Sequence, residues 1–146
     1  MTNRFLAEVS SCRQSDFFVA DPRVRPWVGG ALGSGTMLVM DEDTCVVDFL
    51  RSVADFFAHE SCGQCTPCRE GTQWLRDTLT RISQGRGQEQ DLAFLQKLAA
   101  TLTDASFCPL GQSAPIPLLS ALQHFRPEIE EHIKEKKCRA GVCRFD

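Results

Sequence analysis

Three cysteines stand at two-residue intervals in the segment SCGQCTPCREGTQWL, at Cys62, Cys65 and Cys68. Each short gap lets the backbone turn and direct successive sulfurs to the same side, so the three thiolates can wrap one corner of an iron-sulfur cluster. A fourth ligand has to come from elsewhere. Cys108, in FCPLGQSAP, is the best candidate, because the two helices predicted between it and Cys68 form a hairpin that returns the chain to its starting point. The pattern therefore predicts a 4Fe-4S cluster.

Two other interpretations of these cysteines are a zinc site and uncoordinated buried thiols. Structural zinc usually takes two well-separated pairs of ligands, whereas a triplet with a remote single cysteine favours the cluster. Backbone amides of Gly63 and Gln64 are expected to point at sulfur. A helix opening at Cys68 would turn its positive end toward the cluster. Both effects would raise the reduction potential of the cluster.

Composition limits where such a chain can work. A domain of 146 residues can bury a core without disulfides, so its eight cysteines need another explanation. The balance of 16 basic and 19 acidic residues offers no basic surface for nucleic acid. No apolar run reaches the roughly 18–20 residues of a membrane span, and the first residues lack the order of a secretory signal. We expect a cytoplasmic protein in which clustered cysteines hold metal.

Apolar residues at helical spacing predict a mainly α fold, a small four- to five-helix bundle around the 4Fe-4S cluster, with a short N-terminal β element and an irregular arm. Asp43 or Thr44 is available to cap the first helix, and Trp74 is expected on the apolar side of the second. The expected helices run over Thr44 to about Ala58, Glu70 to about Ser83, from Asp91 onward, from near Pro117 to Phe125, and from Pro127 to near Lys137.

The segment ESCGQCTPCREGTQWL followed by SFCPLGQSAPIPLLSALQHFRPEIEEHI closely resembles the C-terminal iron-sulfur domain of the NADH-binding flavoprotein subunit of respiratory complex I. It resembles still more the equivalent subunit of NAD-linked and electron-bifurcating hydrogenases and formate dehydrogenases. The resemblance implies that Cys62, Cys65, Cys68 and Cys108 bind a 4Fe-4S cluster that takes electrons from flavin and passes them onward. In that family a large FMN- and NADH-binding domain precedes this module. It is absent here, so we expect that this chain alone binds no FMN or NAD.

The resemblance also suggests how the chain is divided. Residues 1–28 would be an irregular N-terminal arm, and residues 29–43 the remnant of a β-grasp-like junction. Residues 44–137 would form the helical iron-sulfur domain, and residues 138–146 a cysteine-containing C-terminal tail.

The tail suggests a second metal site. Cys138 and Cys143 lie in KEKKCRAGVCRFD, which resembles the CPAGVC-like segment that follows the bundle in hydrogenase-type relatives. Cys45 and a histidine from the last helix would complete a four-ligand set that suits a tetrahedral structural zinc. His132 is the first choice and His124 the second. A disulfide, free thiols or a second cluster are the alternatives for the tail cysteines, and a surface or capping role for the histidines.

These features predict an electron-transfer subunit that carries one 4Fe-4S cluster and no catalytic residues of its own. It would work within a multisubunit oxidoreductase: a hydrogenase, a formate dehydrogenase or a complex-I-like NADH dehydrogenase. The expected partners are redox subunits that carry flavin, further clusters or a catalytic metal centre. The alternative is a non-redox assembly scaffold stabilised by zinc.

Overall fold

The structure, a computed structural model, describes residues 40–41 and 43–145. Residues Thr44–Asp146 form one compact unit. The expected mainly α fold is confirmed for the described residues, in which no strand is found. The predicted arm over residues 1–28 lies outside the described residues, and so does nearly all of the predicted junction over 29–43.

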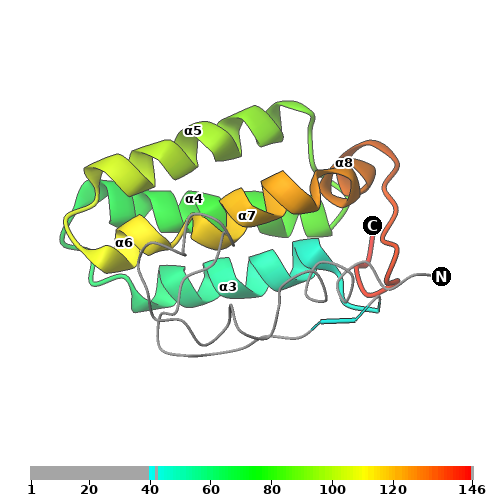
Figure 1. The fold of residues 1–146 in the computed structure, drawn as a ribbon, viewed down its shortest axis with the longest axis horizontal. Coiled ribbons are helices and arrows are strands. Elements are labelled where there is room, and N and C mark those ends of the chain that lie inside the picture. Colours follow the sequence, from blue (N-terminus) through cyan, green and yellow to red (C-terminus); the bar gives the residue numbers. More distant parts are fainter. Residues whose placement is uncertain (1–39, 42, 146) are drawn as a thin grey trace, which may run out of the picture. The chain divides into compact units, whose positions relative to one another are not determined.

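The helices follow one another back and forth along the bundle (Figure 1). They are α3 (Val46–Glu60), α4 (Thr66–Ser83), α5 (Gln90–Ala105), α6 (Pro109–Ser113), α7 (Ile116–His124) and α8 (Arg126–Lys134). The long helices α3 and α4 form a hairpin, α5 packs on α4, and α3 also contacts α7 and α8. Among these described helices, none combines the length and the apolar character that a bilayer crossing requires.

The core is built from the apolar stripes that the periodicity predicts. Each helix except the short α6 contributes at least two buried apolar side chains, because these residues recur every three or four positions and so lie on one face. They include Val47, Leu50, Ala54, Leu75, Leu79, Ile82, Leu95, Leu98, Leu102, Leu118, Ala121, Leu122, Ile129 and Ile133. Gly71 allows α4 and α5 to approach closely, because a Cβ atom there would lie 2.9 Å from Leu102 Cδ2.

The second helix begins earlier than Glu70, where the apolar spacing starts it, and two residues before the helix opening expected at Cys68. The structure starts α4 at Thr66, with Cys65 at the N-cap position and Pro67 in the first turn. Proline is favourable in the first turn, because the amide hydrogen that it lacks would have no partner within the helix there. Its fixed φ also suits the helix. The last two cysteines of the triplet therefore lie at the N-cap and in the first turn of α4. The cap of the first helix also differs, since Cys45 rather than Asp43 or Thr44 occupies the N-cap position of α3.

Two further expectations about the helices were wrong. Trp74 is 52% exposed rather than on the buried side of α4, and its ring lies 6.5 Å from that of Phe94 on α5. The face of α4 that packs inward instead carries small residues such as Thr72 beside Leu75. The short helix α6 was not expected, because five residues with a proline and a glycine give no apolar periodicity.

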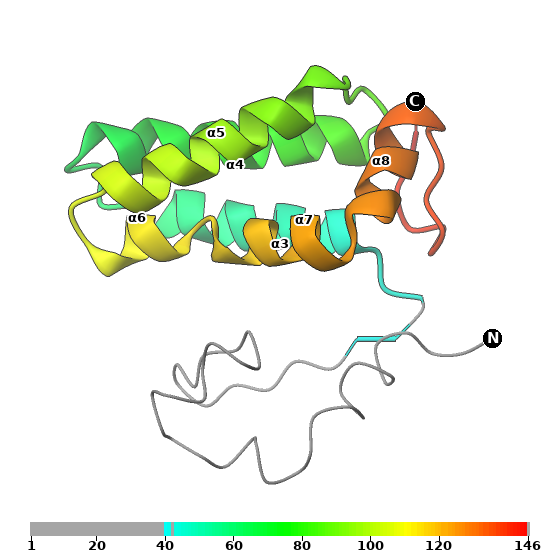
Figure 2. The same cartoon turned by 45° about the horizontal axis from the view of Figure 1, so that its top comes forward.

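The two groups of cysteines lie at opposite ends of the bundle. The loops from α3 to α4 and from α5 to α6 lie at one end, whereas the start of α3, helix α8 and the C-terminal tail lie at the other (Figures 1 and 2). Helix α3 has 15 residues, and at a rise of about 1.5 Å per residue it separates the two ends by roughly 20 Å.

Candidate metal centres

The cysteine triplet runs from the loop after α3 into the first turn of α4. Gly63 has φ +75°, a conformation that favours glycine and lets the chain reverse between the two helices. Cys62 is exposed, whereas Cys65 and Cys68 are buried. The exposure of the cysteines thus decreases from the loop into the first turn of α4. This arrangement leaves one sulfur near the surface and directs the next two toward the interior.

The surroundings of Cys65 favour the form that binds metal. The backbone amide of Phe107 hydrogen-bonds to its sulfur and is the main reason that the pKa of this thiol lies below its usual value. The amide of Cys68 acts in the same direction. A lower pKa favours the thiolate, which is the metal-ligating form. The Phe107 contact also brings the residue that precedes Cys108 beside the triplet.

Cys108 lies at the N-cap position of α6 and is exposed. Close behind it, Gly111 lies against both the triplet and the end of α5: a Cβ atom at this glycine would be 3.0 Å from Cys68 Cβ and 2.5 Å from Ser106 Oγ. Residues 106–111 therefore pack directly on the start of α4. That the four sulfurs of Cys62, Cys65, Cys68 and Cys108 hold one cluster stays a prediction.

Ser106 gives an independent indication that a polar group belongs at this end of the bundle. The residue is 5% exposed, and its hydroxyl has no hydrogen-bond partner among the described residues. A buried polar atom without a partner costs about 1–3 kcal/mol. Sulfur atoms of a cluster beside Cys68 would offer this hydroxyl an acceptor. The donor set and this unsatisfied hydroxyl therefore fit an iron-sulfur cluster.

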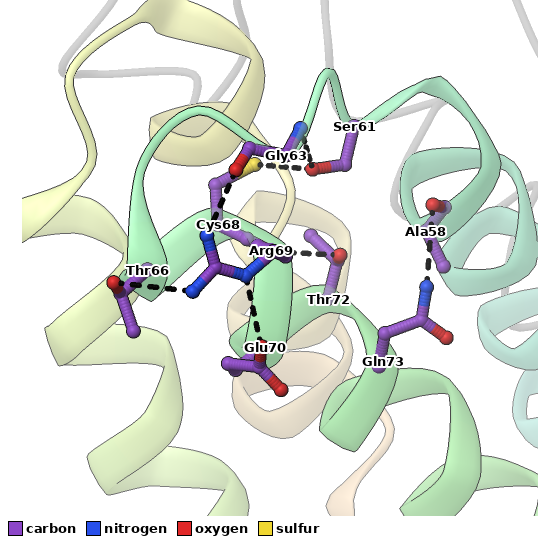
Figure 3. A network of polar contacts seen from close by, with 9 residues as sticks. All are labelled: Ala58, Ser61, Gly63, Thr66, Cys68, Arg69, Glu70, Thr72 and Gln73. Carbon is purple, nitrogen blue, oxygen red and sulfur yellow. Dashed lines mark hydrogen bonds and ion pairs between the residues drawn. The ribbon is translucent and has the colours of Figure 1, made fainter.

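A network of hydrogen bonds fixes the loop around Cys68 (Figure 3). The Ser61 hydroxyl lies 3.3 Å from Cys68 Sγ and accepts a hydrogen bond from the Gly63 amide at 3.4 Å. Arg69 donates to the Gly63 carbonyl at 3.0 Å. The Thr72 hydroxyl donates to the Cys68 carbonyl at 2.8 Å. Sequence patterns did not identify Ser61, Ser106 or Arg69, since serine and arginine are common; the position of Ser61 beside Cys62 was the one available signal.

The second group of candidate ligands meets at the opposite end of the bundle. The ligand atoms of Cys45, His132, Cys138 and Cys143 all lie within 4.8 Å of one another. Cys45 comes from the start of α3, His132 from α8, and the other two from the tail. Cys45 Sγ lies 3.5 Å from Cys143 Sγ and 3.3 Å from His132 Nε2. A tetrahedral zinc with Zn–S bonds of about 2.3 Å holds its sulfurs about 3.8 Å apart, so the spacing suits this ion.

His132 is oriented for metal binding by its second ring nitrogen. The ring is 2% exposed, and Nδ1 lies 2.8 Å from the Glu128 carbonyl oxygen one turn earlier on α8. A carbonyl can only accept, so Nδ1 carries the proton and Nε2 turns toward the cysteines. Histidines that bind metal commonly donate their other N–H in this way. His124, the second choice, is exposed and lies outside the group.

The charges in this group depend on one another. Burial works against a charged His132, but its hydrogen bonds to Cys45 and to the Glu128 carbonyl outweigh burial and raise its pKa to about 9. For Cys138, burial opposes the thiolate, yet the Cys143 amide and His132 lower its pKa to about 6. Burial and the neighbouring Cys45 raise the pKa of Cys143 above its usual value. A cation at this position would compensate several thiolates at once.

Three comparisons with known proteins agree on one family. The profile described as NADH-ubiquinone oxidoreductase-F iron-sulfur binding region matches residues 48–132. The chain is 46% identical over 112 residues to the NADP-reducing hydrogenase subunit HndC of Solidesulfovibrio fructosivorans, covering 77% of this chain and 23% of that protein. It is 47% identical over 110 residues to an NADH-quinone oxidoreductase subunit of Streptomyces coelicolor, covering 75% of this chain and 24% of that protein. It thus spans about a quarter of the length of these relatives.

A solved structure shows the same relationship. The fold matches a chain of the NAD+-reducing [NiFe]-hydrogenase in the H2-reduced state with a TM-score of 0.64 and 38% sequence identity. The match covers 66% of this chain and 17% of that one. The resemblance seen in the cysteine motifs therefore extends to the arrangement of the helices.

Proposed function

The chain belongs to the family described as NADH-ubiquinone oxidoreductase-F iron-sulfur binding region, and we propose that it transfers electrons through one 4Fe-4S cluster held by Cys62, Cys65, Cys68 and Cys108. The observation that carries this proposal is the packing of the segment around Cys108 on the start of α4, where a Cβ atom at Gly111 would lie 3.0 Å from Cys68 Cβ. It brings the segment of the remote cysteine to the triplet. The Phe107 amide adds support, because it lowers the pKa of the Cys65 thiol and so favours the thiolate that binds iron.

A bound 4Fe-4S cluster supplies one-electron exchange. The residues of this chain would retain the iron through four thiolates and set the reduction potential through amides and hydroxyls near the sulfurs. Burial of Cys65 and Cys68 would keep water from part of the site. Such a function needs no general acid, base or nucleophile, so we assign no catalytic residue.

The relatives suggest the setting in which these electrons move. Two of them are named as subunits, one of an NADP-reducing hydrogenase and one of an NADH-quinone oxidoreductase. We propose that this chain likewise works within a multisubunit oxidoreductase, receives electrons from a flavin and passes them to a further redox centre. We propose the cytoplasm as the compartment, because clustered cysteines under reducing conditions hold metal rather than pair as disulfides.

Anaerobic purification and reconstitution test the proposal. We expect about four irons and four sulfides per chain and, after reduction, an electron paramagnetic resonance (EPR) signal of a cubane cluster. Colourless, iron-free protein from anaerobic cells would contradict it. That result together with bound zinc would instead support the alternative, an assembly scaffold without redox function.

We further propose that Cys45, His132, Cys138 and Cys143 bind one structural zinc ion. The spacing of their ligand atoms and the orientation of His132 support this site. Zinc has no redox chemistry and is typically four-coordinate with cysteine and histidine in structural sites. Its contribution would be to fasten the tail and α8 to the start of α3, and metal analysis would find about one zinc per chain.

A further inference from the structure

The Ser61 hydroxyl contacts a sulfur that the proposed cluster would use. Its oxygen lies 3.3 Å from Cys68 Sγ, within hydrogen-bond range for sulfur (Figure 3). A thiolate has no proton to donate, so when Cys68 is a ligand the serine has to be the donor. The Gly63 amide donates to the same serine oxygen. That bond uses an acceptor site of the oxygen and leaves the hydroxyl proton for the sulfur.

Both partners of this contact have fixed positions. Cys68 is 4% exposed in the first turn of α4, and its carbonyl accepts from Thr72. The loop that follows Ser61 is held by Arg69, which donates to the Gly63 carbonyl at 3.0 Å and is paired with Glu70 at 2.9 Å. The contact between Ser61 and Cys68 thus belongs to a structured turn.

A hydrogen bond to a ligand sulfur affects the two redox states of a cluster unequally. Reduction adds one negative charge, which spreads over the iron, the sulfides and the cysteine sulfurs. A donor aimed at one of these sulfurs stabilises the reduced state more than the oxidised state. Hydrogen bonds to the sulfurs are one of the factors that set cluster potentials.

We propose that the Ser61 hydroxyl donates a hydrogen bond to the Cys68 thiolate and thereby raises the reduction potential of the cluster. This inference rests on the proposed function, because it requires the cluster. It assigns to Ser61 the role of a positioning residue that acts through Cys68. It concerns the side chain of this serine, separately from the backbone amides that surround the site.

The test compares wild-type protein, Ser61→Ala and Ser61→Thr, each reconstituted anaerobically to equal iron content. The midpoint potential is measured by a redox titration followed by EPR. We expect Ser61→Ala to change the ratio of oxidised to reduced cluster by about threefold to tenfold at the wild-type midpoint, a downward shift of about 30–60 mV for one electron. Ser61→Thr keeps a hydroxyl and is expected to keep the midpoint.

Two controls separate a specific effect from a general one. Ser83→Ala removes a hydroxyl from the other end of α4 that donates to the Thr80 carbonyl, and it should leave the midpoint unchanged. Pulsed EPR after exchange into D2O should show deuterons coupled to the reduced cluster in every variant, because the backbone amides near the sulfurs also exchange. One of these couplings, present in wild-type protein and in Ser61→Thr, should be lost in Ser61→Ala.

The outcomes are distinct. An unchanged midpoint in a fully loaded Ser61→Ala variant would overturn the inference and leave the proposed function standing. Loss of iron from Ser61→Ala, with retention in Ser61→Thr, would also overturn it, because the hydroxyl would then hold the cluster rather than tune it. Failure of the wild-type protein to bind iron would overturn the proposed function itself.

Discussion

Cys45 Sγ and His132 Nε2 lie 3.3 Å apart although 87 residues separate them in the sequence. The contact joins the N-cap residue of α3 to α8, and Cys138 and Cys143 of the tail lie beside it. This group lies roughly one helix length from the cysteine triplet, since α3 runs from one to the other. The two candidate metal sites can therefore be altered one at a time.

Substitution of the remote cysteine tests the ligand set of the cluster. We expect Cys108→Ser to lower the iron content strongly and to change or abolish the EPR signal of the reduced cluster, because serine is a poor replacement for a thiolate ligand. Cys65→Ser should likewise lower the iron content and alter the EPR signal, and it should also disturb the start of α4. Cys143→Ser is the matched control, since it changes a cysteine at the other end of the bundle and should keep the iron. An unaltered cluster in Cys108→Ser would mean that the fourth ligand is another residue.

Substitution of the histidine tests the zinc site. His132→Asn should lower bound zinc, measured by elemental analysis, while leaving iron and the EPR signal unchanged. The variant should also expose the tail to proteases, because the metal would no longer fasten Cys138 and Cys143 to α3. His124→Asn, in the neighbouring helix, is the control and should keep zinc. Full zinc content in His132→Asn would count against the proposed ligand.

Removal of the unpartnered hydroxyl should stabilise the protein when the cluster is absent. Because Ser106 Oγ is buried without a partner, Ser106→Ala should raise the free energy of unfolding by about 1 kcal/mol, measured by urea denaturation of cluster-free protein. Ser83→Ala is the control with the opposite expectation, since this hydroxyl has a carbonyl acceptor. Destabilisation by Ser106→Ala would show that the hydroxyl already has a partner, such as water.

Acid should weaken the attachment of the tail to α8. Arg139 Nε donates to Glu131 Oε2 at 2.6 Å, and Arg139 Nη2 contacts the other oxygen. The Arg139 guanidinium is the main reason that the pKa of Glu131 lies below its ordinary value. The pair therefore adds stability above the unfolded pKa of about 4.3, and this contribution is lost as the pH falls through the lower folded pKa.

Thermal unfolding of wild-type protein and Arg139→Gln between pH 3 and pH 7 measures this contribution. We expect the wild-type Tm to be higher at pH 7, by an amount that corresponds to less than about 1 kcal/mol since the pair is partly exposed. The two Tm curves should converge at low pH. Arg144→Gln makes the same change of charge on the same tail and should follow the wild-type curve. Parallel curves for wild type and Arg139→Gln would contradict the prediction.

The fold was predictable where the signal is local. Apolar residues at helical spacing identified the buried faces of α3, α5 and α7, because amphipathic helices carry that period. The start of α4 was predicted too late, because the proline and the cysteines of this segment give no apolar periodicity in the first turn of the helix. The exposure of Trp74 could not be predicted, because it depends on where α5 packs and not on hydrophobicity.

The candidate sites also differ in how much of their geometry a local sequence signal can predict. The spacing of Cys62, Cys65 and Cys68 is a local signal for metal binding. The proximity of Cys45 to Cys143 was an expectation drawn from residue types and a resemblance, and only the tertiary structure brings their sulfurs to 3.5 Å. Ser61 matters because its hydroxyl contacts Cys68, and Ser106 because its hydroxyl is buried without a partner. Neither property can be predicted from sequence spacing.

Helix α3 begins at one candidate metal site and ends at the other, with Cys45 just before its first residue and Ser61 just after its last. In an α-helix, one added or deleted residue turns everything beyond it by about 100°. Such a change anywhere between Cys45 and Ser61 would rotate one site away from its remaining ligands. Natural variation in chain length should therefore avoid this helix.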